Sequence, residues 1–258
     1  MKREKQIERI PLARKRSGIA YSALRMGLQF ARAGRSRFVA VVRYLGGKQY
    51  DKGIKQIDWR SRATQLGAYS VIDTRHAPEE YDLVTRRQKE ILIPVLAECI
   101  GGLREGDALD YGCGVGRFTS ELLQFVDGVV YGFDPTAELI VLAPTGHPRM
   151  QFTTVETNVL SHEVNHRYAL IWVCLVLGGL SDDAIREVVP RLNDTLKDDG
   201  LIFIVEATGD TESGSHWRIR TIDQLKRLFE GFDLSVVSHY FDVDQKNSVL
   251  IGRKCAAN

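Results

Sequence analysis

From residue 107 onward, short apolar runs alternate with longer segments whose apolar residues recur at helical spacing. The first pattern is typical of buried β-strands and the second of helices that cover a sheet. We expect strands at 107–112, 128–134, 150–156, 168–177 and 201–207, and helices at 116–126, 135–143, 181–200 and 221–232. Two more strands, 234–243 and 247–254, come next without a helix between them. The pattern predicts an α/β fold with a mainly parallel sheet and an antiparallel pair at its end.

A further helix is expected just before the alternating region. Its start is marked by the sequence APEE, which places Pro78 in a first turn, and its end by the pair Gly101-Gly102. The 258 residues are 44% hydrophobic and 26% charged, as in soluble globular proteins. We find no apolar run near the roughly 20 residues that span a bilayer, and no apolar core of a secretory signal peptide at the N-terminus.

The distribution of charge divides the chain in two. Residues 1–60 hold 16 Lys and Arg against 4 Asp and Glu, whereas residues 61–258 hold 19 against 29. This asymmetry predicts a basic N-terminal extension, 1–60, followed by a single domain, 61–258. Apolar residues in the extension are spaced as on two helices, around 19–31 and 38–45, so we expect the extension to be helical.

The partner of this basic extension is left open by the sequence. Basic helices with an apolar stripe favour attachment of residues 1–50 to an anionic membrane surface or to a partner protein. Nucleic acid is a weaker candidate, and packing of both helices on the domain is an equal alternative. The four cysteines are scattered without CxxC spacing, which predicts a cytoplasmic protein with no metal site. Peripheral attachment at the inner membrane surface is compatible with that location.

A glycine turn links the first expected strand to the helix after it. The sequence ALDYGCGVGR ends the strand with Asp110 and then places glycines at alternate positions, Gly112, Gly114 and Gly116. Such a turn lets a ligand approach the bare backbone. A dinucleotide-binding turn would have its third glycine at the position of Arg117, which counts against NAD or FAD. Asp134, 24 residues after Asp110, ends the second strand, where a carboxylate can accept hydrogen bonds from both hydroxyls of a ribose.

The acidic residue followed by GxGxG resembles motif I of the class I S-adenosylmethionine (SAM)-dependent methyltransferases, and the resemblance covers roughly residues 85–254. It implies a seven-stranded Rossmann-like sheet with an antiparallel last strand, and SAM as cofactor. Arg117 is expected to cap or cover the site. The resemblance implies that the cofactor is bound by Asp110, Gly112, Cys113, Gly114, Gly116, Asp134, Glu156 and Cys174. A surface charge is the alternative for Glu156, and a place in the sheet core is the alternative for Cys174.

Candidate acceptor-binding residues come from two segments that flank this core. The segment after the fifth strand carries His216 as a candidate catalytic base, Trp217 as a stacking platform and Arg218 as an anion ligand. The segment before the domain is expected to form a lid, with Arg75, His76 and Tyr81 facing the pocket. A structural role for His216, and for the three lid residues, is an equally concrete alternative.

The segment after the fourth strand narrows the choice of methyl acceptor. Methyltransferases that act on exocyclic amines or amides resemble one another in an Asn/Asp-Pro-Pro-aromatic motif, but this chain reads VCLVLGGLSD there. The layout resembles bacterial methyltransferases of small molecules and glycans. We therefore expect methyl transfer to an oxygen of a small molecule or glycan. The alternatives are an RNA or ribosomal-protein methyltransferase that uses the basic extension, and a non-catalytic SAM-fold protein that binds a partner.

Overall fold

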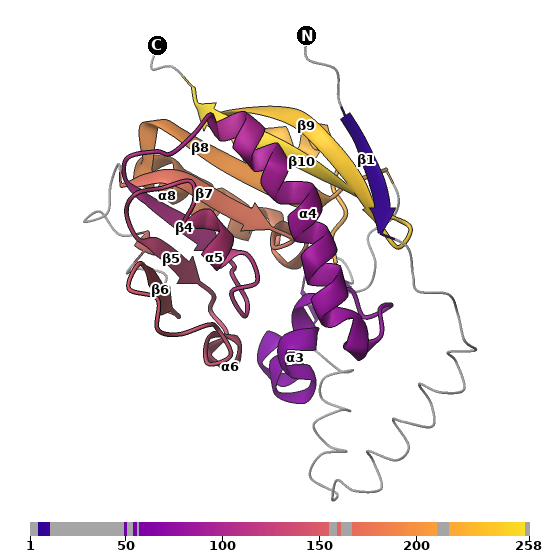
Figure 1. Cartoon of the computed structure of the whole chain (residues 1–258). Coiled ribbons are helices and arrows are strands. Elements are labelled where there is room, and N and C mark those ends of the chain that lie inside the picture. The colour runs from indigo at the N-terminus through magenta and orange to yellow at the C-terminus, as the bar shows by residue number, and fades with distance from the viewer. Residues whose placement is uncertain are drawn as a thin grey trace, which may run out of the picture.

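The computed structural model describes residues 5–10, 49–50, 54–55, 57–154, 159–160, 167–210 and 217–255. Over these residues the chain forms a mixed sheet with helices on both faces (Figure 1). Seven strands make the body of the sheet, in the order β9-β10-β8-β7-β4-β5-β6. Their bounds are β4 (Asp107–Tyr111), β5 (Val130–Phe133), β6 (Met150–Thr153), β7 (Tyr168–Cys174), β8 (Leu196–Ala207), β9 (Phe232–Asp242) and β10 (Gln245–Lys254).

The direction of the strands confirms the predicted fold class. Strands β4 to β8 are parallel to one another, and the last strand, β10, runs antiparallel to both β8 and β9. This is the seven-stranded Rossmann-like sheet with a reversed last strand. Because the parallel strands share one direction, their carboxyl ends meet at one edge, where open α/β sheets bind ligands.

An eighth strand, β1 (Lys5–Ile10), pairs in parallel with the free edge of β9 (Figure 1). The expected helical extension is therefore wrong for these residues, because the unpaired backbone groups of an edge strand offer a partner to another extended segment. A separate short hairpin joins β2 (Gln49–Tyr50) and β3 (Ile54–Lys55). The two helices expected around 19–31 and 38–45 lie outside the described residues.

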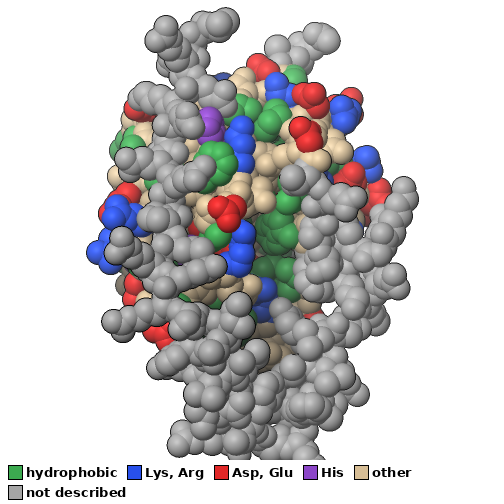
Figure 2. Space-filling view, turned by 90° about the vertical axis from the view of Figure 1, so that its right-hand side faces the viewer, with side chains coloured by type: hydrophobic (Ala, Val, Ile, Leu, Met, Phe, Trp, Pro, Cys, Tyr) green, Lys and Arg blue, Asp and Glu red, His purple; other side chains and the backbone are tan. Residues whose placement is uncertain are grey.

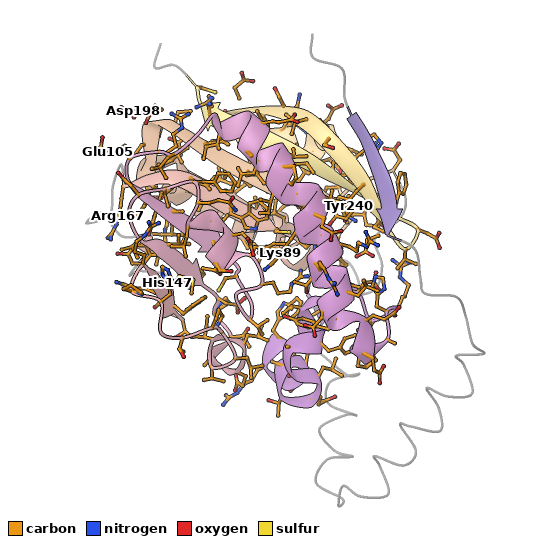
Figure 3. All side chains as sticks on the ribbon, viewed as in Figure 1. Lys89, Glu105, His147, Arg167, Asp198 and Tyr240 are labelled. Atoms are coloured by element: carbon orange, nitrogen blue, oxygen red, sulfur yellow. The ribbon has the colours of Figure 1, made fainter. Side chains whose placement is uncertain are left out.

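The two faces of the sheet are covered by different helices. Leu170 and Trp172 of β7 pack on the side of α4, whereas Ile171 and Val173 pack on the side of α8 and α9, as the alternation of side chains along a strand requires. Tyr240 of β9 is fully buried between α4 and the sheet (Figure 3). The bounds are α4 (Tyr81–Ile100), α8 (Asp182–Thr195) and α9 (Ile222–Leu228).

Short helical elements gather at the carboxyl edge of the sheet. Helices α3 and α6 are in contact there and lie side by side below the strand ends in Figure 1. Their core is a small apolar cluster that contains Ala63, Val115 and Leu139. The bounds are α3 (Trp59–Leu66), η1 (Gly67–Val71), η2 (Pro78–Glu80), α5 (Thr119–Leu122), α6 (Ala137–Ile140) and η4 (Leu177–Gly179).

Helix α8 begins where the sequence predicts and ends five residues early, at Thr195. The side chain of Ser181 caps it by accepting a hydrogen bond from the Ala184 N–H. We expected the helix to continue to Gly200. Instead the chain enters β8 at Leu196, because the apolar side chain of Leu196 is fully buried and its backbone pairs with Tyr168 in the sheet.

One face of the molecule carries charged side chains of both signs. Figure 2 shows Lys, Arg, Asp and Glu side chains interspersed on one side of the molecule, with apolar side chains gathered in a strip near the centre of the view. Within the described part of the chain, no helix is both long and apolar enough to cross a bilayer.

Candidate cofactor and acceptor site

The glycine turn between β4 and α5 exposes its backbone because side chains would not fit there. Gly112 and Gly114 adopt φ angles of +74° and +57°, which L side chains disfavour. A Cβ on Gly112 would lie 2.4 Å from Cγ2 of Val176, and a Cβ on Gly114 would lie 2.9 Å from Cγ1 of Val71. The turn therefore brings bare backbone against the segment after β7 and the segment before α4.

This turn is the floor of a cavity of about 420 Å³ at the carboxyl edge of the sheet. The cavity is closed on its other sides by the ends of β5 and β7, by α3 and by the first turns of α8. Of the residues predicted to bind the cofactor, those that line it are Asp110, Gly112, Cys113, Gly114, Asp134 and Cys174.

Two of the predicted cofactor residues are placed differently. Gly116 is not among the residues that line the cavity. Its missing side chain instead makes room for Phe152 and Pro144, each about 3 Å from where a Cβ would stand. Glu156 lies outside the described residues.

The carboxylate of Asp134 lies at the centre of the cavity wall. Its Oδ2 accepts a hydrogen bond from the Gly114 N–H at 3.0 Å, and its Oδ1 accepts one from the Thr136 N–H at 2.8 Å. Burial raises the pKa of this carboxyl. Each oxygen keeps a second lone pair, so the group can still accept hydrogen bonds from two neighbouring hydroxyls, such as those of a ribose.

Asp110 at the end of β4 is the second carboxylate of the cavity. Only 2% of its surface is exposed, and its Oδ2 accepts a hydrogen bond from the Thr119 hydroxyl at 2.6 Å. Burial raises the pKa of Asp110 to about 7. A carboxyl of this kind favours a cationic ligand group, because the cation stabilises the ionised form that burial disfavours.

Arg117 supplies a positive charge to the same cavity. Its side chain is buried, its guanidinium carbon lies 4.9 Å from the centre of the Phe118 ring, and its Nη1 donates to Oε1 of Gln88 at 2.6 Å. Among the described residues, no carboxylate lies within ion-pair distance of Arg117. The carboxylate of Asp110 acts on Arg117 through its charge, without a direct ion pair. A buried guanidinium that forms no ion pair can still pair with an anionic group on the ligand.

The cysteines of the cavity are not suited to act as nucleophiles. Burial raises the pKa of both Cys113 and Cys174 far above the usual thiol range. Both thiols are therefore neutral at physiological pH, and they contribute surface to the cavity rather than a reactive thiolate.

Two residues that the sequence patterns did not single out shape the wall after β7. Glu206, fully buried at the end of β8, accepts hydrogen bonds from the N–H groups of Leu177 and Gly178 at 2.7 and 3.2 Å. Arg220 binds the carbonyl oxygen of Leu177 at 2.7 Å from the opposite side and forms an ion pair with Asp182. The sequence signals the role of Glu206 in this wall only by placing a glutamate inside the apolar run LIFIVEA.

Two tryptophans meet at this wall. The indole of Trp217 packs on Gly178, where a Cβ would come within 2.0 Å of the ring. Trp217 and Trp59 both lie within 4 Å of the Cβ position of Gly179, which itself lines the cavity. The backbone N–H of Arg218 donates to the Gly178 carbonyl at 2.8 Å. His216 lies outside the described residues.

The three lid residues predicted to face the pocket do not line it. Arg75 forms an ion pair with Asp73 at 2.7 Å, and the buried His76 is hydrogen-bonded to Asp242 at 2.6 Å. Tyr81 packs against the apolar cluster beneath α3. Asp73, which holds Arg75, lies in the lid itself, and Asp242, which holds His76, lies 166 positions further along the chain. The sequence pattern of the lid does not reveal either contact.

The cavity has the features of a nucleoside site and lacks those of a phosphate site. A carboxylate stands where ribose hydroxyls would bind, and it would repel a phosphate. The sheet that carries the cavity has a reversed last strand. These features define a class I SAM-dependent methyltransferase.

Comparison with known proteins narrows the class. The model of the family described as AdoMet dependent proline di-methyltransferase matches residues 60–251, and the chain belongs to this family. The residues that line the cavity fit AdoMet, which is SAM: Asp134 suits the ribose, and Arg117 and Asp110 suit the carboxylate and ammonium of the amino-acid part.

The relatives with curated names are named as N-terminal methyltransferases. The chain is 32% identical over 170 residues to a Danio rerio protein named N-terminal Xaa-Pro-Lys N-methyltransferase 1, which covers 62% of this chain and 74% of the relative. It is 33% identical over 114 residues to the Ailuropoda melanoleuca protein of the same name, over 40% of this chain. That match spans about half the length of the relative, 51%. A Caenorhabditis elegans relative, 31% identical over 51% of this chain and 59% of its own, is named Alpha N-terminal protein methyltransferase 1.

Solved structures share the fold at lower identity. A Leishmania major protein described as a SAM-dependent methyltransferase superposes with a TM-score of 0.54 at 20% identity, covering 80% of this chain and 87% of that one. The structure of DhpI with SAH gives a TM-score of 0.53 at 19% identity, over 77% and 94%. The expected small-molecule or glycan acceptor finds no support among the named relatives, and the protein-directed alternative is closer to them.

Proposed function

We propose that this protein transfers methyl groups from SAM to the α-amino group of polypeptide N-termini. The observation that carries the proposal is the family match over residues 60–251, which includes every residue that lines the SAM cavity except Trp59. The names of the relatives supply the substrate class, the N-terminal amine of a protein.

The residues of the cavity suit this reaction. SAM supplies an activated methyl group on a sulfonium. Asp134 would hold the ribose, and Arg117 with Asp110 would hold the amino-acid end, so an acceptor would enter from the part of the cavity lined by the end of β7 and the wall at Gly179. An acceptor at that wall is aligned for in-line displacement, and alignment is the main contribution a protein makes to such a step.

An α-amine needs little help to become a nucleophile. Its pKa in a peptide is about 7.7–8.0, so a useful fraction carries a free lone pair near neutral pH. The nitrogen forms its bond to the methyl carbon as the carbon–sulfur bond breaks, and the methylated ammonium then loses its proton to solvent. The indoles of Trp59 and Trp217 lie at this wall, and an indole face that contacts the acceptor would attract the cationic product by a cation–π interaction.

The test is methylation of short peptides by the purified protein with methyl-labelled SAM. We expect label on a peptide that begins Xaa-Pro-Lys, and none on the same peptide with an acetylated N-terminus. Label on the acetylated peptide would move the acceptor to a side chain. Label on a glycan or RNA pool but on no peptide would overturn the proposal, and SAM binding without any transfer would favour the non-catalytic alternative.

Replacing Trp217 by alanine is expected to raise the KM for the peptide about tenfold, since an aromatic contact of this kind contributes roughly 0.5–1.5 kcal/mol. The affinity for SAM should stay unchanged, because Trp217 is not among the residues that line the SAM cavity. Steady-state kinetics and calorimetry on Trp217→Ala and Trp217→Phe provide the measurement. Equal loss in both variants would indicate that the ring does not act through its aromatic face.

A further inference from the structure

Four buried polar side chains form a continuous hydrogen-bonded line from the lid to the SAM cavity. His76 Nε2 donates to Oδ1 of Asp242 at 2.6 Å, Gln88 Nε2 donates to Oδ2 of Asp242 at 3.3 Å, and Arg117 Nη1 donates to Oε1 of Gln88 at 2.6 Å. Each of the four residues is at most 8% exposed. The line runs close to Tyr240, two residues before Asp242 on β9, which Figure 3 labels beside α4.

Only one orientation of the Gln88 amide satisfies both of its neighbours. Its NH₂ must face the carboxylate of Asp242 and its oxygen must face the guanidinium of Arg117, because the reverse would set donor against donor and acceptor against acceptor. Gln88 is thus held from both sides, and Arg117 is held in turn by an acceptor that cannot rotate away. Thr85, one turn earlier on α4, adds a longer contact of 3.5 Å to Arg117.

The line also holds Arg117 without forming an ion pair with it. The carboxylate of Asp242 is matched by His76, and the hydrogen bond between them raises the pKa of His76, with Glu80 and Asp73 acting in the same direction. Gln88 is neutral, so it holds the guanidinium without neutralising it. A carboxylate at position 88 would have formed an ion pair with Arg117 and satisfied its charge within the protein.

We propose that Gln88, Asp242 and His76 are positioning residues that hold Arg117 in place, without an ion pair to any of them, for the carboxylate of the amino-acid part of SAM. The line ties the segment before α4 to the end of β9, so the lid and the C-terminal hairpin both fix the cofactor arginine. The proposal rests on the proposed function only in that SAM is the cofactor, and it holds for any methyl acceptor.

The test compares two ligands that differ in the amino-acid part. S-adenosylhomocysteine (SAH) carries the carboxylate, whereas 5′-methylthioadenosine has the same adenosine and sulfur without it. Gln88→Leu should lower the affinity for SAH about tenfold, the loss of one charged contact, and should leave the affinity for 5′-methylthioadenosine unchanged. The exposed Gln124→Leu is the matched control and should bind both ligands like the wild type.

Two further variants make the outcome decisive. Gln88→Glu keeps the shape of the side chain and should also weaken SAH binding selectively, because the new carboxylate pairs with Arg117. In the double variant Gln88→Leu with Arg117→Ala, the loss should equal that of Arg117→Ala alone, since both act through one contact. Equal weakening of both ligands, or full additivity in the double variant, would overturn the positioning role. These measurements use binding alone, so a wild type that binds SAH but methylates no peptide would refute the proposed acceptor and leave this inference standing.

Discussion

Replacing Asp134 by alanine is expected to weaken SAM binding by about 10- to 100-fold. Among the described residues, Asp134 is the only carboxylate at the end of β5 that lines the cavity. The loss of hydrogen bonds to a charged group costs about 1.5–3 kcal/mol. The measurement is calorimetric titration of the folded variant with SAM and with SAH. Both ligands contain the ribose, so both should lose affinity together.

The same change also affects the stability of the protein itself, and the two effects can be separated. Asp134 accepts hydrogen bonds from the N–H groups of Gly114 and Thr136, which alanine leaves without this acceptor. A fall in thermal stability is therefore expected as well. Asp134→Asn retains one acceptor oxygen and should fall between the wild type and Asp134→Ala in both measurements. Unchanged SAM affinity in a folded Asp134→Ala protein would remove the ribose from this position.

Much of the fold could be predicted from the sequence because the signals are local. Strand and helix periodicity over residues 107–254 is enough to place five parallel strands, and two strands without a helix between them are enough to place the reversed last strand. Strand β1 could not be predicted in this way. Its partner β9 lies more than 220 residues away, and pairing over that distance leaves no pattern in the segment itself.

The cofactor site could be predicted from local motifs, whereas the side chains that hold Arg117 could not. The glycine turn and Asp134 are marked by short motifs at strand ends, so the sequence singles them out. The line that holds Arg117 joins residues 166 and 154 positions apart, His76 to Asp242 and Gln88 to Asp242. The sequence predicts that His76 faces the pocket because it lies in the expected lid segment. Only the folded chain reveals the carboxylate that holds it elsewhere.

The missing Asn/Asp-Pro-Pro-aromatic motif restricts the acceptor less than we expected. Its absence argues against planar exocyclic amines and amides, whose nitrogen lone pairs are delocalised. An α-amine is basic and has a localised lone pair, so that motif is not needed to activate it. The attachment of residues 1–50 to a membrane or partner stays a prediction, since residues 11–48 lie outside the described part of the chain.

We expect the affinity for SAM to fall as the pH is lowered below about 7, because of Asp110. Burial raises the pKa of this carboxyl to about 7 in the protein without SAM. A cationic ammonium beside it favours the ionised form and so lowers its pKa in the complex. Between the two pKa values, binding must therefore release a proton. The affinity then rises with pH through this window, by at most tenfold per pH unit, and levels off above it.

The variant Asp110→Asn separates this effect from other titrations. It cannot ionise, so its SAM affinity should be lower than that of the wild type at pH 7.5 by about 10-fold or more and should change little between about pH 5.5 and pH 7. Any slope that remains belongs to other buried carboxyls near the cavity, namely Asp134 and Glu206, whose pKa values burial also raises. The ammonium of the ligand itself loses its proton above about pH 8, which sets the upper limit of the window. Calorimetry in buffers of different ionisation enthalpy counts the released protons directly. A wild type that releases no proton at pH 6 would show that the ionisation of Asp110 does not change on SAM binding and therefore does not govern cofactor affinity.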